Sequence, residues 1–178
     1  PIDIETRIAL TIETPPLGIS SCVSFLRGTF AGPSAGRDTA GALVEAIQYV
    51  GAKQVAFTSP YVKTLSQEAV SYLTDSGIDV VNEVSFNQEL NSLEQNALTP
   101  QDAYDKALKA DHPDAQAIVI SCTDYRALEA VPAIEKTLGK PVITSNQALM
   151  FACLTRLDAP LWGLTAGGYL FTDSGRNR

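Results

Sequence analysis

Residues 117–148 constrain the fold more than any other passage, because short apolar runs alternate there with a helical pattern. Ala117–Ile120 is apolar and partly β-branched, which is typical of a parallel strand buried on both faces. Pro132 would damage a continuous helix, so we expect a first turn at Tyr125–Ala130 and a main helix with Pro132 near its start. The passage therefore predicts a strand–helix–strand unit of a parallel sheet.

The same alternation extends through most of the chain. Apolar periodicity and breaker residues predict a helix from Asp38 or Thr39 to Gly51, a strand at 55–57, a helix at 64–74, a strand at 78–86, a polar connection at 87–98, a helix from Thr99 to Ala110, and a last helix at 147–157 that is capped by Ser145 or Asn146 and holds Cys153 in the core. Repeated β-α order predicts the α/β class, with parallel sheets and helices on both faces.

Two Ser-Cys corners indicate two similar halves. I-S-S-C ends at Cys22 and V-I-S-C ends at Cys122, each after an apolar approach. We expect two Rossmann-like halves with the active site in the crevice between them. Residues 1–36 plus 145–178, with a returning C-terminal helix, would form the N-terminal half, and residues 37–144 the second. Ligands of such sheets bind beyond the carboxyl ends of the strands, so both thiols would surround one small ligand.

Cys122 is the strongest catalytic candidate, because it stands where a buried strand stops. Thr123 and Asp124 follow as candidate N-cap residues, so the thiol would lie beside free N–H groups and the positive end of a helix dipole. Such a position favours thiolate and binds carboxylate. The alternative is that Cys122 is a small buried hydrophobe, as free cysteines commonly are.

Tyr61 is a candidate ligand-binding residue at another strand end, where T-S-P-Y closes the strand and Pro60 fixes the turn. Its hydroxyl could donate to a ligand carboxylate, or Tyr61 could be a half-buried strand-end aromatic. His112 lies in Asp-His-Pro within a connecting loop, where a surface residue is expected. It has no evident Cys-His or Ser-His-Asp partner.

A resemblance to a known family rests mainly on residues 121–148, which read S-C-T-D-Y-R-A-L-E-A-V-P-A-I-E-K-T-L-G-K-P-V-I-T-S-N-Q-A. This passage resembles the second cysteine motif of the aspartate/glutamate racemase superfamily, in the branch of maleate cis-trans isomerase and arylmalonate decarboxylase. S-F-L-R-G at 24–28, T-S-P-Y at 58–61 and G-G-Y-L-F at 167–171 agree with it. The resemblance implies catalytic roles for Cys122 and Cys22, and substrate contacts from Ser20, Ser21, Tyr61, Thr123 and Asn91, with Asn87 and Asn96 as rivals of Asn91.

The first cysteine motif departs from the family pattern. C-T-x-x-S-F in the relatives would place the first catalytic cysteine at position 20, which is Ser20 here. Cys22 lies two residues later, where the family usually places a carboxylate-binding hydroxyl. Both a two-cysteine and a one-cysteine mechanism therefore stay open. The N-terminal half is also shorter than in the relatives, so we expect either lost or omitted segments.

Composition excludes several classes of function. A net charge of −7 and a pI near 4.6 oppose nucleic-acid binding. The chain contains neither an apolar run of about 18 residues nor a signal-peptide pattern, so we expect a cytoplasmic protein with no membrane contact. Three cysteines without C-x-x-C spacing predict reduced thiols. Nucleotide-binding and metal-binding motifs are absent from the sequence, which predicts no cofactor and no metal.

These observations leave three hypotheses for function. The first is a cofactor-independent, cysteine-dependent isomerase or racemase of a small mono- or dicarboxylic acid, similar to maleate isomerase, with Cys122 as proton carrier or nucleophile. The second is an arylmalonate-type decarboxylase in which Cys122 protonates an enediolate. The third is a non-catalytic protein that binds a small acid. A homo-oligomer is compatible with each of them.

Overall fold

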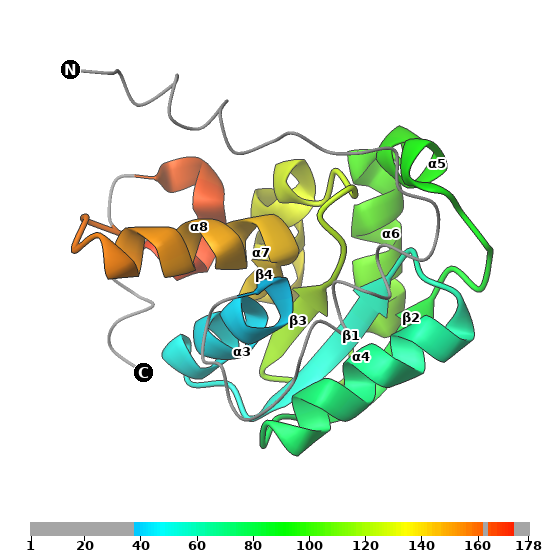
Figure 1. Ribbon diagram of the computed structural model, residues 1–178, viewed down its shortest axis with the longest axis horizontal. Helices are drawn as coiled ribbons and strands as arrows, with labels where there is room; N and C mark the ends of the chain where they lie inside the picture. Colours follow the sequence, from blue (N-terminus) through cyan, green and yellow to red (C-terminus); the bar gives the residue numbers. More distant parts are fainter. Residues whose placement is uncertain (1–37, 162–163, 173–178) are drawn as a thin grey trace.

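Four parallel strands form the centre of the part of the chain that the computed structural model describes, residues 38–161 and 164–172 (Figure 1). The elements along the chain are α3 (Thr39–Tyr49), β1 (Gln54–Ser59), α4 (Lys63–Asp75), β2 (Asp79–Ser85), α5 (Ser92–Ala97), α6 (Pro100–Ala110), β3 (Ala117–Ile120), the 3₁₀ turn η1 (Leu128–Ala130), α7 (Val131–Leu138), β4 (Val142–Thr144), α8 (Ser145–Arg156) and the 3₁₀ segment η2 (Thr165–Phe171).

The strand order is β2-β1-β3-β4, and every neighbouring pair is parallel. β1 and β3 are the central strands, and all four residues of β3 are buried. This arrangement confirms the α/β class and the strand predicted at Ala117–Ile120. Because parallel strands share one direction, their carboxyl ends meet at one edge of the sheet, where the candidate site residues follow them.

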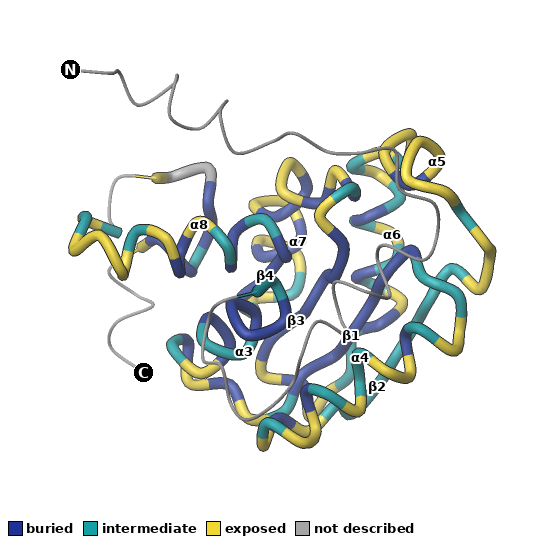
Figure 2. Tube along the Cα trace, viewed as in Figure 1, coloured by how far each residue is buried: buried dark blue, intermediate teal, exposed yellow. Residues whose placement is uncertain are grey.

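Helices cover both faces of the sheet, and the alternation of side chains along the strands separates two cores. On β1, Val55 and Phe57 point into a core shared with α3, α4 and α8. Ala56, between them, points into the opposite core with α6 and α7. Figure 2 shows β1, β3 and β4 as a buried centre, whereas the edge strand β2 is intermediate and exposed residues lie on the outer faces of the surrounding helices. The prediction of helices on both faces is confirmed.

Side-chain caps begin α3, α5, α6 and α8, and the helix starts predicted near Asp38 and at Thr99 are confirmed. Asp38 accepts from Gly41 N at 2.7 Å at the start of α3, and Thr99 forms a capping box with Asp102 before α6. The prediction of Ser145 or Asn146 as the cap of α8 is wrong. Thr144 is the cap, because the last residue of β4 remains extended and its hydroxyl accepts from Gln147 N at 3.2 Å.

Two further local predictions are wrong. The passage at 87–98 is not all connection, because Asn91 and Glu94 form a capping box that begins the short helix α5. Cys153 is exposed rather than in the core. The buried stripe of α8 includes Ala148, Phe151 and Ala152, and Cys153 lies outside it by the helical period. Pro132 behaves as predicted, since it lies in the first turn of α7. The turn predicted at Tyr125–Ala130 is shorter in the structure, where η1 spans Leu128–Ala130.

The C-terminal segment is fastened to α7 and β4 by one buried carboxylate. Glu135 on α7 accepts from Val142 N at 3.0 Å and from Tyr169 N at 3.0 and 3.1 Å. Gln147 on α8 donates to Gly167 O at 2.7 Å. In the described part of the chain, α8 and η2 thus pack on the same sheet as residues 38–144. The division into halves at residue 144 stays a prediction, because residues 1–37 lie outside the described ranges.

Within those ranges, no helix combines the length and the apolar character that crossing a membrane requires.

Candidate active site

The carboxyl edge of the sheet brings together two of the predicted site residues. Tyr61 follows β1, and Cys122 follows β3, the neighbouring strand. Ser121 lies between them, since its hydroxyl oxygen is 3.4 Å from the Tyr61 hydroxyl. Ser121 N also donates to Thr58 O at 2.9 Å, which extends the β1–β3 pairing to the site. Sheet register therefore fixes the separation of the two candidates.

Cys122 is buried, with 6% of its surface exposed, and its backbone has φ 135°. Such a positive φ is strained for a residue other than glycine and is common at functional sites. Cys122 N donates to Ser145 Oγ at 3.1 Å, which ties the corner to the first residue of α8. The prediction that a helix begins directly after Cys122 is wrong. Residues 123–127 form turns, and the first helical turn begins at Leu128.

The thiol contacts a residue that the sequence pattern did not identify as a site residue. Cys122 Sγ donates to Gln95 Oε1 at 3.0 Å, and Gln95 has only 8% of its surface exposed. Gln95 lies on α5, 27 positions earlier in the chain. No sequence pattern marked Gln95 as a site residue, because the passage that contains it is short and polar. Only the fold of α5 over the sheet edge brings the Gln95 amide to the thiol.

Thr123 and Asn91 lie at the surface in this structure. Thr123 is exposed, and its carbonyl accepts from Asn146 Nδ2 at 3.2 Å. Asn91 is also exposed, and its side-chain oxygen caps α5 by accepting from Leu93 N and Glu94 N. Their substrate contacts stay predictions. Ser20, Ser21 and Cys22 lie outside the described residues, so their predicted roles also stay predictions.

Tyr125 is a buried phenol near the thiol. It has 1% of its surface exposed, its ring packs edge-on against Phe86, and its hydroxyl has no hydrogen-bond partner among the described residues. Burial raises the pKa of Tyr125, and the nearby carboxylates of Asp102 and Asp105 and the thiol of Cys122 add to this shift. Tyr125 therefore remains a neutral phenol in the wall behind Cys122.

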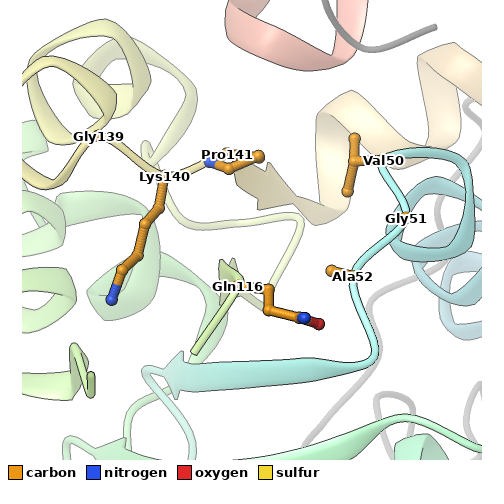
Figure 3. A pocket seen from close by; sticks show the side chains of 7 residues that line it. All are labelled: Val50, Gly51, Ala52, Gln116, Gly139, Lys140 and Pro141. Carbon is orange, nitrogen blue, oxygen red and sulfur yellow. The ribbon is translucent and has the colours of Figure 1, made fainter. Parts of the chain in front are cut away.

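A hollow of about 310 Å³ lies at the opposite, amino-terminal edge of the sheet (Figure 3). Its two polar side chains already bind neighbours. Gln116 accepts from Lys53 N and Gln54 N, and Lys140 donates to Asp111 and to the His112 carbonyl. Ligands of open α/β sheets bind at the other edge, so we assign the site to the Cys122 corner. In the described ranges, no group of three or more His, Cys, Asp or Glu side chains could hold a metal ion.

The fold and the site define an α/β protein with a buried thiol at the carboxyl edge of a parallel sheet. A family model described as arylmalonate decarboxylase matches residues 33–169, and the chain belongs to this family. The maleate isomerase of Geobacillus stearothermophilus is 31% identical over 133 residues, which cover 74% of this chain and 53% of that relative. The chain thus spans about half the length of the curated relatives that it matches.

Solved structures agree with the sequence comparison. The maleate isomerase Iso of Pseudomonas putida S16 has a TM-score of 0.72 and 32% identity, covering 76% of this chain and 54% of that chain. A mutant of the Nocardia farcinica maleate cis-trans isomerase, with a covalently bound succinylcysteine intermediate, has a TM-score of 0.72 and 25% identity, covering 86% of this chain and 62% of that chain. The predicted resemblance to the aspartate/glutamate racemase superfamily is confirmed.

Proposed function

We propose that this chain carries part of the active site of a cofactor-independent isomerase that acts on a small dicarboxylic acid such as maleate. The observation that carries the proposal is Cys122, a buried thiol in a strained backbone at the carboxyl edge of the sheet, beside the hydroxyl groups of Ser121 and Tyr61. Cysteine supplies both a nucleophile and a proton donor. Hydroxyl groups next to it can hold the carboxylate of a substrate.

Two solved relatives support this substrate class. A cysteine-to-alanine variant of the P. putida enzyme was solved with maleate. The N. farcinica enzyme, in a variant with serine in place of one cysteine, holds a succinylcysteine. The adduct there must form on a cysteine other than the replaced one. A succinyl group on sulfur corresponds to maleate whose double bond has gained one C–S bond and one C–H bond.

The reaction follows from these bonds. A thiolate adds to one carbon of the double bond, and the π electrons move onto the neighbouring carbon and its carboxylate. Protonation of that carbon gives the saturated adduct, and the new single bond rotates. A base then removes a proton from the carbon that was protonated, and the C–S bond breaks. This elimination re-forms the double bond as the trans isomer and returns the electron pair of the C–S bond to sulfur. Cys122 serves either as the nucleophile or as the proton carrier in this scheme, and Tyr61, Thr123, Ser21 and Asn91 bind carboxylate.

Arylmalonate decarboxylation is the second candidate, and the family model and Ser20 favour it. The model that matches residues 33–169 is described by that activity, and the sequence has serine where a two-cysteine mechanism expects the first cysteine. In this reaction the C–CO₂ bond breaks, its electron pair forms an enediolate, and Cys122 returns a proton to carbon. One cysteine suffices.

The experiment separates these functions by product. The whole protein is incubated with maleate or with an aryl malonate, and NMR follows fumarate formation or loss of carbon dioxide. Cys122→Ser should abolish either reaction, whereas Cys153→Ser, the matched change at an exposed thiol, should leave it unchanged. Full turnover by Cys122→Ser would refute the role of Cys122. Binding of maleate without any turnover would instead support the non-catalytic hypothesis.

Cys22 is tested separately. If Cys22 is a second catalytic thiol, Cys22→Ala should abolish isomerisation as completely as Cys122→Ser. If Cys22 only lines the carboxylate site, the same change should mainly raise KM. In the second case, Ser20→Cys should increase exchange of a substrate α-proton with deuterated water, which NMR measures directly.

A further inference from the structure

The register of the sheet brings the start of α8 next to the corner that holds Cys122. Ile120, the last residue of β3, pairs with Thr144, the last residue of β4. β3 leads into the Cys122 corner, and β4 leads directly into α8. Because the two strands are parallel neighbours, the residues that follow them leave the sheet side by side. The first turn of α8 is therefore placed to bind the backbone of the corner.

Two side chains of this turn make such contacts. Cys122 N donates to Ser145 Oγ at 3.1 Å, and Ser145 is fully buried. Asn146 Nδ2 donates to the Thr123 carbonyl at 3.2 Å at the surface of the corner. The backbone is thus tied to α8 at Cys122 itself and again one residue later.

Ser145 and Asn146 are available for these contacts because other residues cap α8. Thr144 Oγ1 accepts from Gln147 N at 3.2 Å, and Gln147 Oε1 accepts from Thr144 N at 2.8 Å, which completes the capping box of this helix. Serine and asparagine are good caps because their short side chains bind nearby backbone groups. At the start of α8 the same property serves a backbone segment 23 residues earlier in the chain.

α8 is a firm base for holding the corner. Phe151 packs against Tyr49 of α3, with ring centroids 4.8 Å apart, and Arg156 forms an ion pair with Glu45 of the same helix at 3.1 Å. The corner, by contrast, contains the φ of 135° at Cys122. A residue other than glycine keeps such a conformation only where the surrounding structure enforces it. The two hydrogen bonds from α8 provide this enforcement.

We propose that Ser145 and Asn146 are positioning residues, which hold the corner in its strained conformation and so keep the Cys122 side chain at the site. They act through the backbone of Cys122 and Thr123. The inference rests on the proposed function for its meaning in catalysis, and it holds whichever step Cys122 performs. Without the two contacts, the corner relaxes and the thiol moves relative to a bound dicarboxylate. Misplacement of a reacting group by about 1 Å slows a reaction by about 100-fold.

Two variants of the full chain remove the contacts one at a time. Ser145→Ala takes away the acceptor of Cys122 N, and Asn146→Ala takes away the donor of the second contact. Alanine is a better helix former than asparagine, and the Asn146 contact lies at the surface, so Asn146→Ala should leave the stability of the protein almost unchanged. Gln101→Ala is the matched control, because Gln101 is the second residue of α6, as Asn146 is of α8, and its amide binds Asp105.

The first readout is alkylation of Cys122 by iodoacetamide at fixed pH, which needs no turnover. Cys22, Cys122 and Cys153 lie in three separate tryptic peptides, so mass spectrometry follows each thiol, and exposed Cys153 is the internal reference. The ratio of the Cys122 rate to the Cys153 rate should rise about fivefold in each variant, because loss of one hydrogen bond favours local opening of the corner by about that factor. Gln101→Ala should leave this ratio unchanged.

The second readout is the turnover of maleate. In both variants kcat should fall about tenfold or more, while KM changes by less than about twofold, because a misplaced thiol affects the reacting step more than binding. A role confined to the folding of α8 predicts instead that Asn146→Ala keeps the alkylation ratio and kcat of the wild type.

Several results would overturn the proposal. It fails if the alkylation ratio is unchanged in both variants, if the ratio rises only as far as a loss of global stability in urea accounts for, or if kcat stays at its wild-type value although the ratio rises. An unchanged ratio in one folded variant removes that residue from the proposal. If Ser145→Ala does not fold by circular dichroism, Asn146→Ala decides alone.

The two readouts also separate this inference from the proposed function. An unchanged ratio in variants of an enzyme that converts maleate refutes the roles of Ser145 and Asn146 only. A raised ratio in variants of a protein whose wild type does not convert maleate refutes the proposed function, and it leaves the two residues as the groups that hold the corner.

Discussion

Replacing Glu135 tests whether one buried carboxylate holds the C-terminal segment to the sheet. Glu135 has 8% of its surface exposed and accepts from the backbone N–H groups of Val142 and Tyr169. Val142 begins β4, and Tyr169 lies in η2, so a single side chain joins α7 to both elements. Glu135→Ala removes the acceptor while both donors remain in place.

The expected cost follows from these donors. A buried donor left without its partner costs about 1–3 kcal/mol, and Glu135→Ala leaves two. Relief from burying a charge offsets part of this sum, so we expect the free energy of unfolding to fall by about 3 kcal/mol near neutral pH. Glu135→Gln should cost less, about 1 kcal/mol, because the oxygen at the Oε1 position can still accept from Val142 N at 3.0 Å and from Tyr169 N at 3.1 Å. Its NH₂ group replaces only the acceptor at the Oε2 position, 3.0 Å from Tyr169 N.

The pH dependence has a defined sign. Burial raises the pKa of Glu135 above its ordinary value of 4.5, and the backbone N–H groups of Val142 and Tyr169 oppose this shift only in part. Between the unfolded and the folded pKa, the folded state binds more protons than the unfolded state. The stabilisation from this group is therefore complete below pH 4.5 and is lost as the pH rises through the folded pKa. Glu135→Gln lacks this loss.

Urea unfolding followed by circular dichroism, at several pH values between about 4 and 8, measures both effects. The stability of Glu135→Gln should improve relative to the wild type as the pH rises, and Glu135→Ala should be the least stable protein near neutral pH. If Glu135→Ala unfolds at the same urea concentration as Glu135→Gln throughout, the carboxylate does not hold the two N–H groups. A wild type that gains stability relative to Glu135→Gln with rising pH would refute the raised pKa.

Three further changes test separate features by unfolding or kinetics. Gly168→Ala should lower the free energy of unfolding by about 2 kcal/mol more than Gly139→Ala does. Both glycines have positive φ, but a Cβ at position 168 would lie 2.6 Å from Glu135 Oε2, whereas the space at position 139 is open. Equal losses of stability in urea unfolding would refute the steric argument. Tyr125→Phe should raise stability by about 1 kcal/mol, because the buried hydroxyl has no partner among the described residues, and a clear loss would show that the hydroxyl is satisfied. Tyr61→Phe should raise KM for a dicarboxylate by about tenfold with little change in kcat, and an unchanged KM would remove Tyr61 from the carboxylate site.

The backbone architecture could be predicted from the sequence because it depends on local patterns. The apolar run Ala117–Ile120 and the breaking effect of Pro132 both act within a few residues. Thr99 before Pro100 likewise marks a helix start through its own hydroxyl. Such signals locate strands and helices, and the parallel order then places Cys122 at the carboxyl edge of the sheet.

The errors arise where two local signals compete or where a helix face is ambiguous. Thr144, Ser145 and Asn146 are all good caps, and the structure selects Thr144 because the sheet ends there. Cys153 is apolar enough for a core position, yet its helical angle places it outside the buried stripe of α8. A shift of one residue along a helix moves a side chain by 100°, so periodicity alone did not decide this position.

Side-chain partners at the site depend on distant segments, and for this reason the chemistry of Cys122 was less predictable than its position. Sequence placed the thiol beside a helix start, which would favour thiolate. The structure instead places it 3.0 Å from the acceptor oxygen of Gln95, 27 residues away. Residue type and strand order thus predict where a cysteine lies, whereas the partner of its sulfur comes from a distant segment that local patterns do not identify.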